Sequence, residues 1–223
     1  MSARIAVFAS GTGSNLDAII RHLAAAGGAA AAPRVCLVAS DKTDAGALAI
    51  AQRAGIASSV IRDPADPVAM RAMLRDQGIT LVALAGYLRM IPAAISEEWR
   101  GQIINVHPAL LPAFGGKGMY GGRVHAAVIA AGARLTGVTV HFVDAEYDHG
   151  PVIAQWPVPV FASDSAVTLA SRVLRVEHWL YPRAVDAVAG GRVRLDGSGR
   201  VVGTCLSSTD ATSFSLGTIS PEK

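Results

Sequence analysis

Cysteine is scarce in this chain, with only two in 223 residues. Cys36 stands in an apolar run and Cys205 in a polar stretch, and neither belongs to a C-x-x-C pair. This scarcity argues against a disulfide framework, and no set of histidine, cysteine and carboxylate residues has the spacing of a metal site. We therefore expect a protein of the reducing cytoplasm that holds no metal.

Long apolar runs and clusters of basic residues are also missing. The residues before Gly11 contain too short an apolar run for a secretory signal, which needs roughly 7–15 apolar residues, or for a membrane helix of about 20. No Lys/Arg run is present to grip a nucleic-acid backbone, although the net charge of +3 and the pI of about 9.1 suit small anionic ligands. We expect neither a membrane nor a nucleic-acid partner, and a monomer or homodimer that binds small molecules.

Apolar residues make up 51% of the chain and the mean hydropathy is +0.38, which is ample for a core. Solidly apolar runs alternate with helical patterns, which predicts an α/β fold: a Rossmann-like open, twisted, mostly parallel sheet with helices on both faces and some antiparallel pairing in the C-terminal part. One domain is expected over residues 1–203, followed by a flexible tail at 204–223. The expected strands are 4–10, 34–40, 58–62, 79–85, 103–107, 135–143 and 152–161, the helices are 15–26, 45–54, 68–77, 124–131 and 165–189 (the last capped by Asp164), and a terminal hairpin covers 192–202.

A glycine-containing loop, Gly11-Thr12-Gly13-Ser14-Asn15, connects the first expected strand to the first helix. Glycines let the backbone approach a ligand closely, and the following helix directs free N–H groups and its dipole at an anion. Residue 16 is a leucine rather than the third glycine of a dinucleotide fingerprint, and the lysine of a P-loop is missing. A single phosphate monoester therefore fits this loop better than NAD or ATP. A tight turn without a ligand is the alternative.

Asn105 and His107 lie two residues apart in an apolar, β-branched run, so both side chains leave the same face of the strand. Pro108 ends the strand and favours an extended His107. The pair lies at the carboxyl end of the strand, where open α/β sheets bind ligands. With a later carboxylate, an amide and an imidazole can polarise a carbonyl and move a proton, which indicates acyl transfer. Asp148, in Tyr-Asp-His-Gly-Pro, is a candidate, although a turn aspartate is typical there.

Five other polar residues are ambiguous by pattern alone. Glu177 lies among apolar residues on the long helix, and it faces either a cationic or polyol ligand or the solvent. His141, in mid-strand, is expected to be structural, and His125 and His149 are expected at the surface. Asp41 ends the second strand but lies rather far from the glycine loop for the ribose-binding acid of an NAD protein.

Six motifs, in this order and spacing, resemble the folate-dependent phosphoribosylglycinamide formyltransferase family over residues 4–196. They are Gly11-Thr-Gly13-Ser14-Asn15-Leu, Leu84-Ala-Gly86-Tyr-Leu-Arg89, Asn105-Val-His107-Pro108-Ala-Leu-Leu-Pro112, Val140-His141-Phe-Val-Asp144, Asp148-His-Gly150-Pro151 and Glu177-His-Trp-Leu-Tyr-Pro182. The resemblance implies formyl transfer from 10-formyltetrahydrofolate, as co-substrate, to the amine of N1-(5-phospho-D-ribosyl)glycinamide in de novo purine biosynthesis.

The resemblance also assigns residues. It implies a phosphate-binding half at about 1–100 and a catalytic and folate-binding half at about 101–203. The implied catalytic residues are Asn105, His107 and Asp148. The implied ribonucleotide-binding residues are Gly13, Ser14, Asn15 and Glu177, and the implied folate-binding residues are Leu88, Arg89, Met90, Ile91, Asn105, Val143 and Asp144.

The implied reaction accounts for the catalytic residue types. The amine attacks the formyl carbon, and the negative charge that develops on the formyl oxygen would be hydrogen-bonded by Asn105 and a protonated His107. Asp148 would favour the imidazolium, so we expect the pKa of His107 to lie above its usual value of about 6.5. Asp148 would also accept the amine proton, directly or through water, while His107 helps to protonate the folate nitrogen.

The chain departs from this family in two places. The segment from Phe114 to Gly122 is longer than usual and lacks a histidine; Lys117 within it either supplies a compensating charge or is an exposed loop residue. Asp66-Pro67 stands where many members carry an arginine that contacts the folate, which weakens the expected grip on the glutamate end of the folate.

Three other functions share parts of the pattern. Methionyl-tRNA formyltransferase and formyltetrahydrofolate hydrolase resemble this chain around the site, but they carry an RNA-binding C-terminal domain and a regulatory N-terminal domain, respectively, and we expect neither domain here. A non-catalytic nucleotide sensor would keep the glycine loop and have no use for Asn105, His107 and Asp148. Tetrahydrofolate formation, measured with and without the ribonucleotide, separates these functions.

Overall fold

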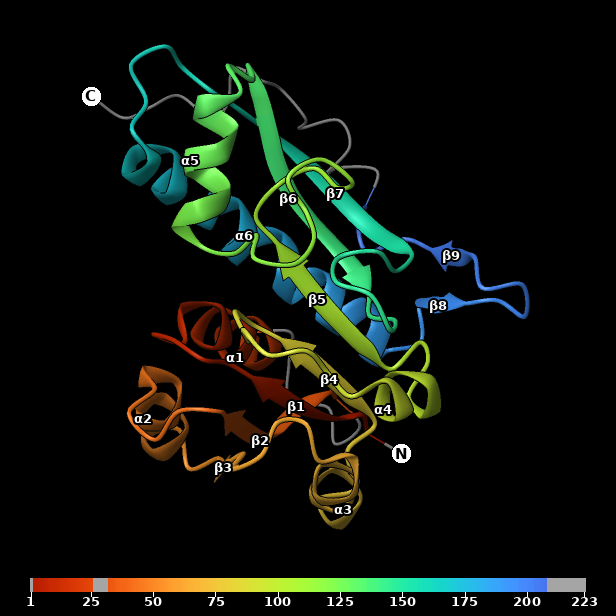
Figure 1. The fold of residues 1–223 in the computed structure, drawn as a ribbon. Coiled ribbons are helices and arrows are strands. Elements are labelled where there is room, and N and C mark those ends of the chain that lie inside the picture. The colour runs from red at the N-terminus through yellow and green to blue at the C-terminus, as the bar shows by residue number, and fades with distance from the viewer. Residues whose placement is uncertain (1, 26–31, 208–223) are drawn as a thin grey trace.

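The computed structural model describes residues 2–25 and 32–207 (Figure 1). Within these residues, seven strands form one sheet in the order β3-β2-β1-β4-β5-β6-β7. The strands are β1 (Arg4–Phe8), β2 (Arg34–Ser40), β3 (Ala57–Val60), β4 (Leu81–Leu84), β5 (Ile103–His107), β6 (Leu135–Phe142) and β7 (Val152–Pro159), and β8 (Val193–Leu195) and β9 (Val201–Gly203) form a separate hairpin. The helices are α1 (Ser14–Ala25), α2 (Gly46–Arg53), α3 (Pro67–Asp76), α4 (Ala93–Glu98), α5 (Gly122–Ala130) and α6 (Ala166–Ala189).

The sheet is parallel from β3 to β5 and antiparallel from β5 to β7. Neighbouring strands that run in the same direction need a long crossover, which helices supply here, whereas the short connection after β6 returns the chain directly into β7. The residues of β4 are all buried, as expected for a parallel strand covered on both faces. The predicted fold class is therefore confirmed.

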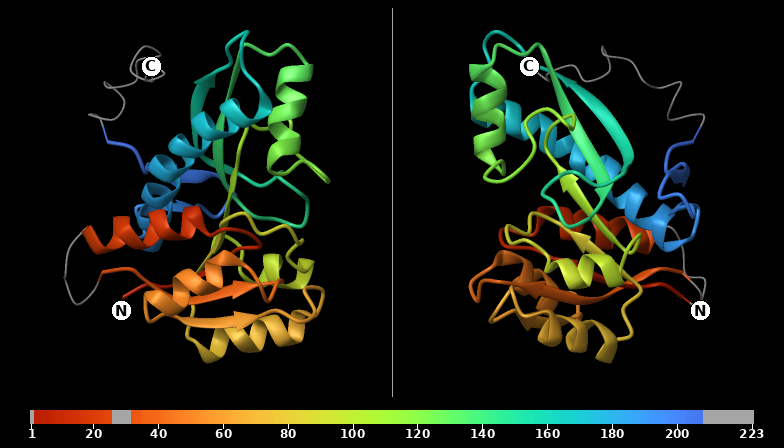
Figure 2. Two further views of the ribbon diagram at one scale, coloured as in Figure 1. Left: turned by 90° about the vertical axis from the view of Figure 1, so that its left-hand side faces the viewer. Right: turned by 45° about the vertical axis from the view of Figure 1, so that its right-hand side comes forward.

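Helices cover both faces of the sheet (Figures 1 and 2). Buried side chains of α1, α2, α5 and α6, such as Leu16 and Leu180, belong to one core. Buried side chains of α3 and α4, such as Leu74, belong to a second core. Successive side chains of a strand point to opposite faces, so Val7 of β1 packs in the first core and Phe8 in the second.

The predicted helices and strands agree with the structure to within two residues at each end, and the predicted terminal hairpin is confirmed as β8 and β9. Residue 26, the last of the first predicted helix, lies outside the described residues. The predicted flexible tail also lies outside them from residue 208 onward.

The N-terminus of α6 differs from the prediction. Ser165, not Asp164, is the N-cap: its side chain accepts a hydrogen bond from the Thr168 amide, and the Thr168 hydroxyl in turn accepts one from the Ser165 amide. This reciprocal pair satisfies two helix-end donors. The Asp164 carboxylate instead pairs with the buried guanidinium of Arg172, at 2.7 Å from each of two nitrogens. The sequence alone did not show that Asp164 would pair with Arg172 instead of capping the helix, because Arg172 lies two turns further along the helix.

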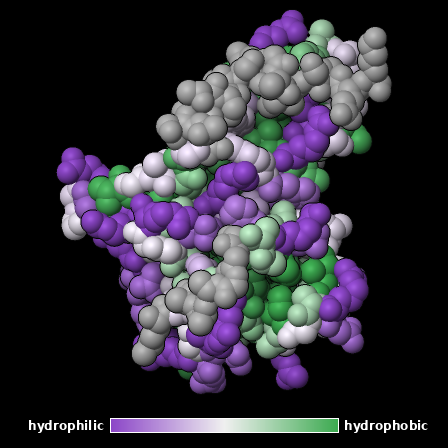
Figure 3. Space-filling view, turned by 180° about the vertical axis from the view of Figure 1, so that it is seen from behind, coloured by the Kyte–Doolittle hydropathy of each residue, from purple (hydrophilic) through white to green (hydrophobic). Residues whose placement is uncertain are grey.

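Among the described residues, no helix combines the length and the apolar character needed to cross a bilayer. Figure 3 shows the back of the molecule, where hydrophilic residues are spread among smaller hydrophobic areas. Cys36 is a free thiol.

Candidate active site

Two cavities meet at the carboxyl edge of the sheet. The first, of about 370 Å³, is lined by residues 86–91, the end of β5, residues 116–121 and residues 143–148. The second, of about 490 Å³, is lined by the glycine loop, residues 121–122 and one side of α6. Gly86, Pro108 and Gly121 line both cavities, so a ligand in one can reach a ligand in the other.

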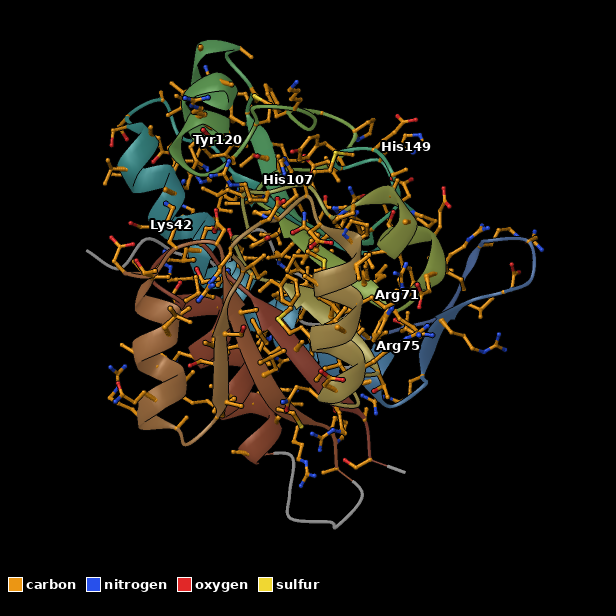
Figure 4. The ribbon with its side chains drawn as sticks, turned by 60° about the horizontal axis from the view of Figure 1, so that its bottom comes forward. Lys42, Arg71, Arg75, His107, Tyr120 and His149 are labelled. Atoms are coloured by element: carbon orange, nitrogen blue, oxygen red, sulfur yellow. The ribbon has the colours of Figure 1, made fainter. Side chains whose placement is uncertain are left out.

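The structure brings the three predicted catalytic residues together in the first cavity. Asn105 and His107 leave the same face of β5, as predicted, and Asp148 reaches them from the connection between β6 and β7. One Asp148 oxygen lies 3.4 Å from His107 Nδ1, and the other accepts a hydrogen bond from Asn105 Nδ2 at 3.4 Å. Figure 4 shows His107 in the middle of this region, with His149 farther out.

His141 also belongs to this cluster, which sequence reasoning did not predict. Its β6 position pairs with Asn105 in the antiparallel register between β5 and β6. His141 Nδ1 lies 2.8 Å from the Phe142 carbonyl oxygen, which can only accept, so the proton of a neutral ring is on Nδ1. The bare Nε2 then accepts a hydrogen bond from Asn105 Nδ2 at 3.2 Å. The antiparallel pairing was the missing signal, because it alone places residue 141 beside residue 105.

Thr139 fixes the chain just after His107. It pairs with His107 across the strands, its buried hydroxyl donates to the Ala109 carbonyl at 2.6 Å, and it accepts from the Leu111 amide at 3.0 Å. The segment that follows the catalytic histidine is therefore held by hydrogen bonds as well as by Pro108.

The segment from Phe114 to Gly116 covers the polar groups of the cluster. His107 Nε2 donates to the Phe114 carbonyl at 2.8 Å, and the Gly116 amide donates to an Asp148 oxygen at 2.9 Å. Phe114 and Asp148 both have a φ of +56°, a conformation that costs a non-glycine residue roughly 1–2 kcal/mol. Aspartate tolerates this conformation better than phenylalanine does, and such strain is often found at functional sites.

The pKa of His107 contradicts the prediction made from its partner. Burial lowers this pKa more than the Asp148 carboxylate and the Phe114 carbonyl raise it, so it lies below its usual value rather than above it. Burial raises the pKa of Asp148, but the neighbouring His141 and His107 rings and the hydrogen bond from the Gly116 amide together hold it below its usual range. The site thus contains a carboxylate beside an imidazole that is mainly neutral at pH 7.

The predicted phosphate-binding residues, Gly13, Ser14 and Asn15, line the second cavity at the N-terminus of α1. The first-turn N–H groups of a helix have no acceptor within it, so they are available to an anion. Gly13 has a φ of +82°, and a Cβ there would lie 2.8 Å from the Ala47 backbone. The position therefore requires glycine for both its conformation and its packing against α2.

Glu177 faces the same cavity from α6. One of its carboxylate oxygens accepts a hydrogen bond from Asn15 Nδ2 at 2.6 Å. Burial raises the pKa of Glu177, and the bond from Asn15 only partly offsets this effect. The Asn15 Oδ1 atom is buried and has no hydrogen-bond partner among the described residues. The pair thus presents polar atoms to a ligand next to the anion-binding loop.

The residues predicted to contact folate all line the first cavity: Leu88, Arg89, Met90, Ile91, Asn105, Val143 and Asp144. Leu88 and Met90 are each 40% exposed, so their apolar side chains are accessible to a ligand in this cavity. Lys117, Tyr120 and Arg123, which the residue assignments left out, line this cavity as well.

Two predictions about single histidines have different outcomes. His149 lies at the surface, as predicted, and its ring pairs with Asp144 at 2.9 Å. The prediction for His125 was wrong: it is only 4% exposed, and it lines the second cavity. It lies on α5, which packs on the first core, so burial follows from the helix face rather than from the residue type.

Comparisons with known proteins agree with this geometry. Residues 3–185 match the family model described as Formyl transferase. The chain is 43% identical over 198 residues to the chloroplastic phosphoribosylglycinamide formyltransferase of Arabidopsis thaliana, which covers 86% of this chain and 67% of that protein. It is 36% identical over 193 residues to the phosphoribosylglycinamide formyltransferase of Bacillus subtilis (strain 168), covering 84% of this chain and 95% of that protein.

A solved structure shows the same fold. The crystal structure of phosphoribosylglycinamide formyltransferase from Anaplasma phagocytophilum is similar with a TM-score of 0.81 at 36% identity, covering 92% of this chain and 95% of that chain. The family model and these relatives extend over the sheet, the glycine loop and the residue cluster at the carboxyl edge. The chain therefore belongs to the formyl transferase family.

Proposed function

We propose that this protein transfers the formyl group of 10-formyltetrahydrofolate to the amine of N1-(5-phospho-D-ribosyl)glycinamide, in de novo purine biosynthesis. The observation that carries the proposal is the position of Asn105, His107 and Asp148 beside the junction of two cavities. One cavity ends in an anion-binding helix terminus, and the other combines the apolar side chains of residues 88, 90 and 91 with polar and charged groups. Such a pair suits a phosphorylated acceptor and a heterocyclic donor.

In this proposal the ribonucleotide occupies the second cavity. Its phosphate accepts hydrogen bonds from the backbone at Gly13, Ser14 and Asn15, where the α1 dipole favours negative charge. The ribose hydroxyl groups donate to Glu177, whose carboxylate is held by Asn15 at 2.6 Å. The amine then points toward Pro108 and Gly86, where the two cavities meet.

The formyl donor occupies the first cavity. Its fused rings lie against Leu88, Met90 and Ile91, with backbone groups of residues 88–91 and 143–144 as hydrogen-bond partners. No cationic residue takes the position of the family arginine at Asp66, so Arg89, Lys117 and Arg123, which line this cavity, are the available partners for the donor's glutamate carboxylates. In this proposal the first cavity recognises both ends of the formyl donor, its fused rings and its glutamate carboxylates.

The reaction exchanges one C–N bond for another. The amine nitrogen attacks the formyl carbon, and the bond between this carbon and N10 of the folate breaks. One proton leaves the amine, and one proton arrives at N10. Asp148 accepts the amine proton, directly or through water, and passes it to His107 Nδ1, so that the resulting imidazolium delivers its Nε2 proton to N10. Asn105 Nδ2 and His107 Nε2 donate to the formyl oxygen, whose negative charge grows in the transition state.

The lowered pKa of His107 fits this sequence of events. Its Nδ1 faces Asp148 at 3.4 Å, so a proton taken up there is stabilised by an ion pair. Charge development on the formyl oxygen raises the affinity of the ring for that proton as the reaction proceeds. The ring is thus neutral before the reaction and gains its charge when the oxyanion forms.

Substrate binding requires an exchange of hydrogen bonds. In the structure His107 Nε2 donates to Phe114, and both hydrogens of Asn105 Nδ2 are used by His141 and Asp148. The Asn105–Asp148 contact of 3.4 Å is the longer of the two, so it is the one given up to the formyl oxygen. The Phe114 carbonyl must likewise move away from His107.

The test is the absorbance change on tetrahydrofolate formation, with and without the ribonucleotide. We expect turnover only when both substrates are present. His107→Ala and Asp148→Asn should each lower kcat by about 10²–10⁴-fold with little change in the KM of the ribonucleotide. His149→Ala, at an exposed histidine next to Asp148, is the matched control and should remain near wild type.

Other results would favour the other functions. Equal turnover without the ribonucleotide would indicate a formyltetrahydrofolate hydrolase. Binding of the ribonucleotide with no turnover at all would indicate a sensor. Wild-type kcat in either the His107 or the Asp148 variant would refute the catalytic assignment, whatever the substrates are.

We also propose that the protein works in the cytoplasm, with these two small molecules as its partners and no metal. The scarcity of cysteine and the free thiol of Cys36 suit a reducing compartment. A kinetic test is simple: activity should survive dialysis against a metal chelator, and a loss that added metal restores would contradict this part of the proposal.

A further inference from the structure

Asp41 is a buried carboxylate that lies behind the wall of the first cavity. It follows β2 directly, and its neighbour Lys42 marks this strand end in Figure 4. The Asp41 side chain is only 2% exposed and belongs to the lining of neither cavity. A charge buried to this degree needs strong partners, because desolvation alone disfavours it.

Both hydrogen-bond partners of Asp41 connect it to residues that line the first cavity. One Asp41 oxygen accepts a hydrogen bond from the Ser10 hydroxyl at 2.6 Å, and the other accepts one from Arg89 Nε at 2.9 Å. The Ser10 hydroxyl in turn accepts a hydrogen bond from the Leu88 amide at 3.0 Å. Leu88 and Arg89 both line the first cavity. The carboxylate therefore holds this wall by two separate routes.

The direction of these bonds makes Asp41 the organising group. The Ser10 hydroxyl has one proton, and its donation to Asp41 leaves a lone pair directed at the Leu88 amide. A backbone bond from the Ser10 amide to the Gly86 carbonyl, at 3.1 Å, holds the start of the same segment. Because Ser10 is itself buried, its hydroxyl cannot turn away from Asp41 to form a hydrogen bond with water instead.

Arg89 is oriented by the same carboxylate. Its side chain is 61% exposed, and it gives Nε to Asp41. The structure shows no other ion pair for this guanidinium among the described residues, so its terminal N–H groups remain available at the cavity. An arginine held by Nε presents a fork that fits a carboxylate.

We propose that Asp41 is a positioning residue for the formyl donor: through Ser10 and through its ion pair it holds Leu88 and Arg89 in the conformation that receives the donor. This inference rests on the proposed function, because it concerns the donor of that reaction. Asp41 does not touch either substrate. Its effect is expected on donor binding, and not on the ribonucleotide or on the bond exchange.

The test is the Asp41→Asn variant. Asparagine keeps the shape and can still accept from Ser10, but it presents an N–H group to Arg89. We expect the KM of the formyl donor to rise on the order of 10-fold, as for loss of a charged hydrogen bond to a partly exposed partner. The KM of the ribonucleotide and kcat should stay within about 2-fold of the wild-type values, because the charged hydrogen bond that is lost holds only residues that line the donor cavity. Asp44→Asn, in the same loop at an exposed aspartate, is the matched control.

A double variant separates a positioning role of Asp41 from a non-specific loss of structure. If Asp41 acts partly through Arg89, Asp41→Asn should raise the donor KM less in an Arg89→Met background than in the wild type. If Asp41→Asn does not fold, Ser10→Ala tests the other route and should show the same rise confined to the donor. An unchanged donor KM in the variant that folds, or an equal rise in the KM of both substrates, would refute the inference.

Direct binding distinguishes this failure from failure of the proposed function. Calorimetric titration with tetrahydrofolate should show weaker binding to Asp41→Asn than to the wild type. If the wild type neither binds tetrahydrofolate nor turns over the donor, the proposed function is wrong. If the wild type does both and Asp41→Asn matches it, only the positioning role of Asp41 is wrong.

Discussion

Glu177 illustrates how a single buried residue is tuned by its surroundings. Burial raises its pKa, and the hydrogen bond from Asn15 opposes that effect without cancelling it. The group therefore gains a proton at a higher pH than an ordinary glutamate does. A protonated carboxyl accepts hydrogen bonds more weakly, so the ribose binding that we propose for Glu177 should weaken as the pH falls toward this raised pKa.

This tuning predicts a pH-dependent effect of Glu177→Gln. At a pH well above the raised pKa, where the wild-type carboxylate is charged, the variant should have a KM for the ribonucleotide about 10-fold higher, as for loss of a charged hydrogen bond. As the pH is lowered toward the raised pKa, the wild-type KM should rise toward that of the variant, whose own KM stays flat. Steady-state kinetics from pH 8 to pH 5 measure both curves.

The control for this prediction is Glu97→Gln, at an exposed position on α4. It removes the same charge and should leave the KM of the ribonucleotide unchanged at every pH. A constant ratio of KM between Glu177→Gln and the wild type across the range would show that Glu177 does not titrate as its burial implies.

Among the elements, α6 depends on an ion pair at its first turns. Arg172 donates to Asp164 from two nitrogens, and its guanidinium lies 4.4 Å from the centre of the Phe161 ring. The hydrogen bonds from Arg172 are the main cause that lowers the pKa of Asp164 to about 2. Because the folded-state pKa is depressed, the pair stabilises the fold at pH values above the usual aspartate pKa, and this contribution is lost as the pH falls through about 2.

Asp164→Asn should therefore destabilise the protein at neutral pH. The expected loss is about 3 kcal/mol, because the variant leaves the buried Arg172 charge without its partner. The difference from the wild type should shrink between about pH 4 and pH 2, where the wild-type carboxylate itself becomes protonated. Urea unfolding at pH 7, 5 and 3 measures this difference.

Asp186→Asn provides the comparison on the same helix. Asp186 pairs with Arg192, whose side chain is 57% exposed, so this variant should lose no more than about 1 kcal/mol. Equal losses of unfolding free energy in the two variants would mean that burial of the Asp164–Arg172 pair adds nothing to its contribution to stability.

The connection between β6 and β7 depends on a glycine in a different way. A Cβ at Gly150 would overlap the Phe142 carbonyl oxygen, which belongs to the backbone and cannot rotate away. Gly150→Ala should push this connection, and Asp148 with it, away from His107. We expect kcat to fall by at least about 10²-fold, as for loss of general acid–base help.

The matched control is Gly197→Ala, between β8 and β9 and outside both cavities. A Cβ at Gly197 meets nothing within 4 Å, and the residue has no positive φ. This variant should keep both its kcat and its melting temperature. If Gly150→Ala keeps the wild-type kcat, the position of Asp148 does not depend on the close approach of Gly150 to β6.

At the scale of the whole molecule, we propose that residues 1–203 form one domain. The sheet continues from β3 to β7 without a break, and the first core contains buried residues from β1 as well as from β8. The two halves of the chain therefore share a core, although each one supplies a different part of the site. A boundary between them would have to cut through the paired strands β4 and β5.

One domain predicts one cooperative unfolding transition. Trp99 lies in the second core, whereas Trp156 and Trp179 pack on the first. A Trp99→Phe variant should therefore report on the first core by fluorescence, and a Trp156→Phe/Trp179→Phe variant should report on the second. In each variant the urea midpoint from fluorescence should equal the midpoint from far-UV circular dichroism. Two separate midpoints in either variant would show that the two faces unfold independently.

Much of this protein follows from its sequence alone. Backbone sterics and the spacing of apolar residues act over a few positions, so they determined the strands, the helices and the glycine loop before α1. The same local rules placed Asn105 and His107 on one face of β5. The six motifs, read as a resemblance, assigned residues that the structure brings into the two cavities.

Only the tertiary structure decided the environment of each polar group. His141 joins the cluster because β6 pairs with β5, and Asp41 meets Arg89 although the two are 48 positions apart in the sequence. The pKa of His107 lies below its usual value because burial outweighs the effect of a nearby carboxylate. Desolvation and long-range pairing depend on which surfaces meet, and that information is spread over the whole chain rather than held in any single motif.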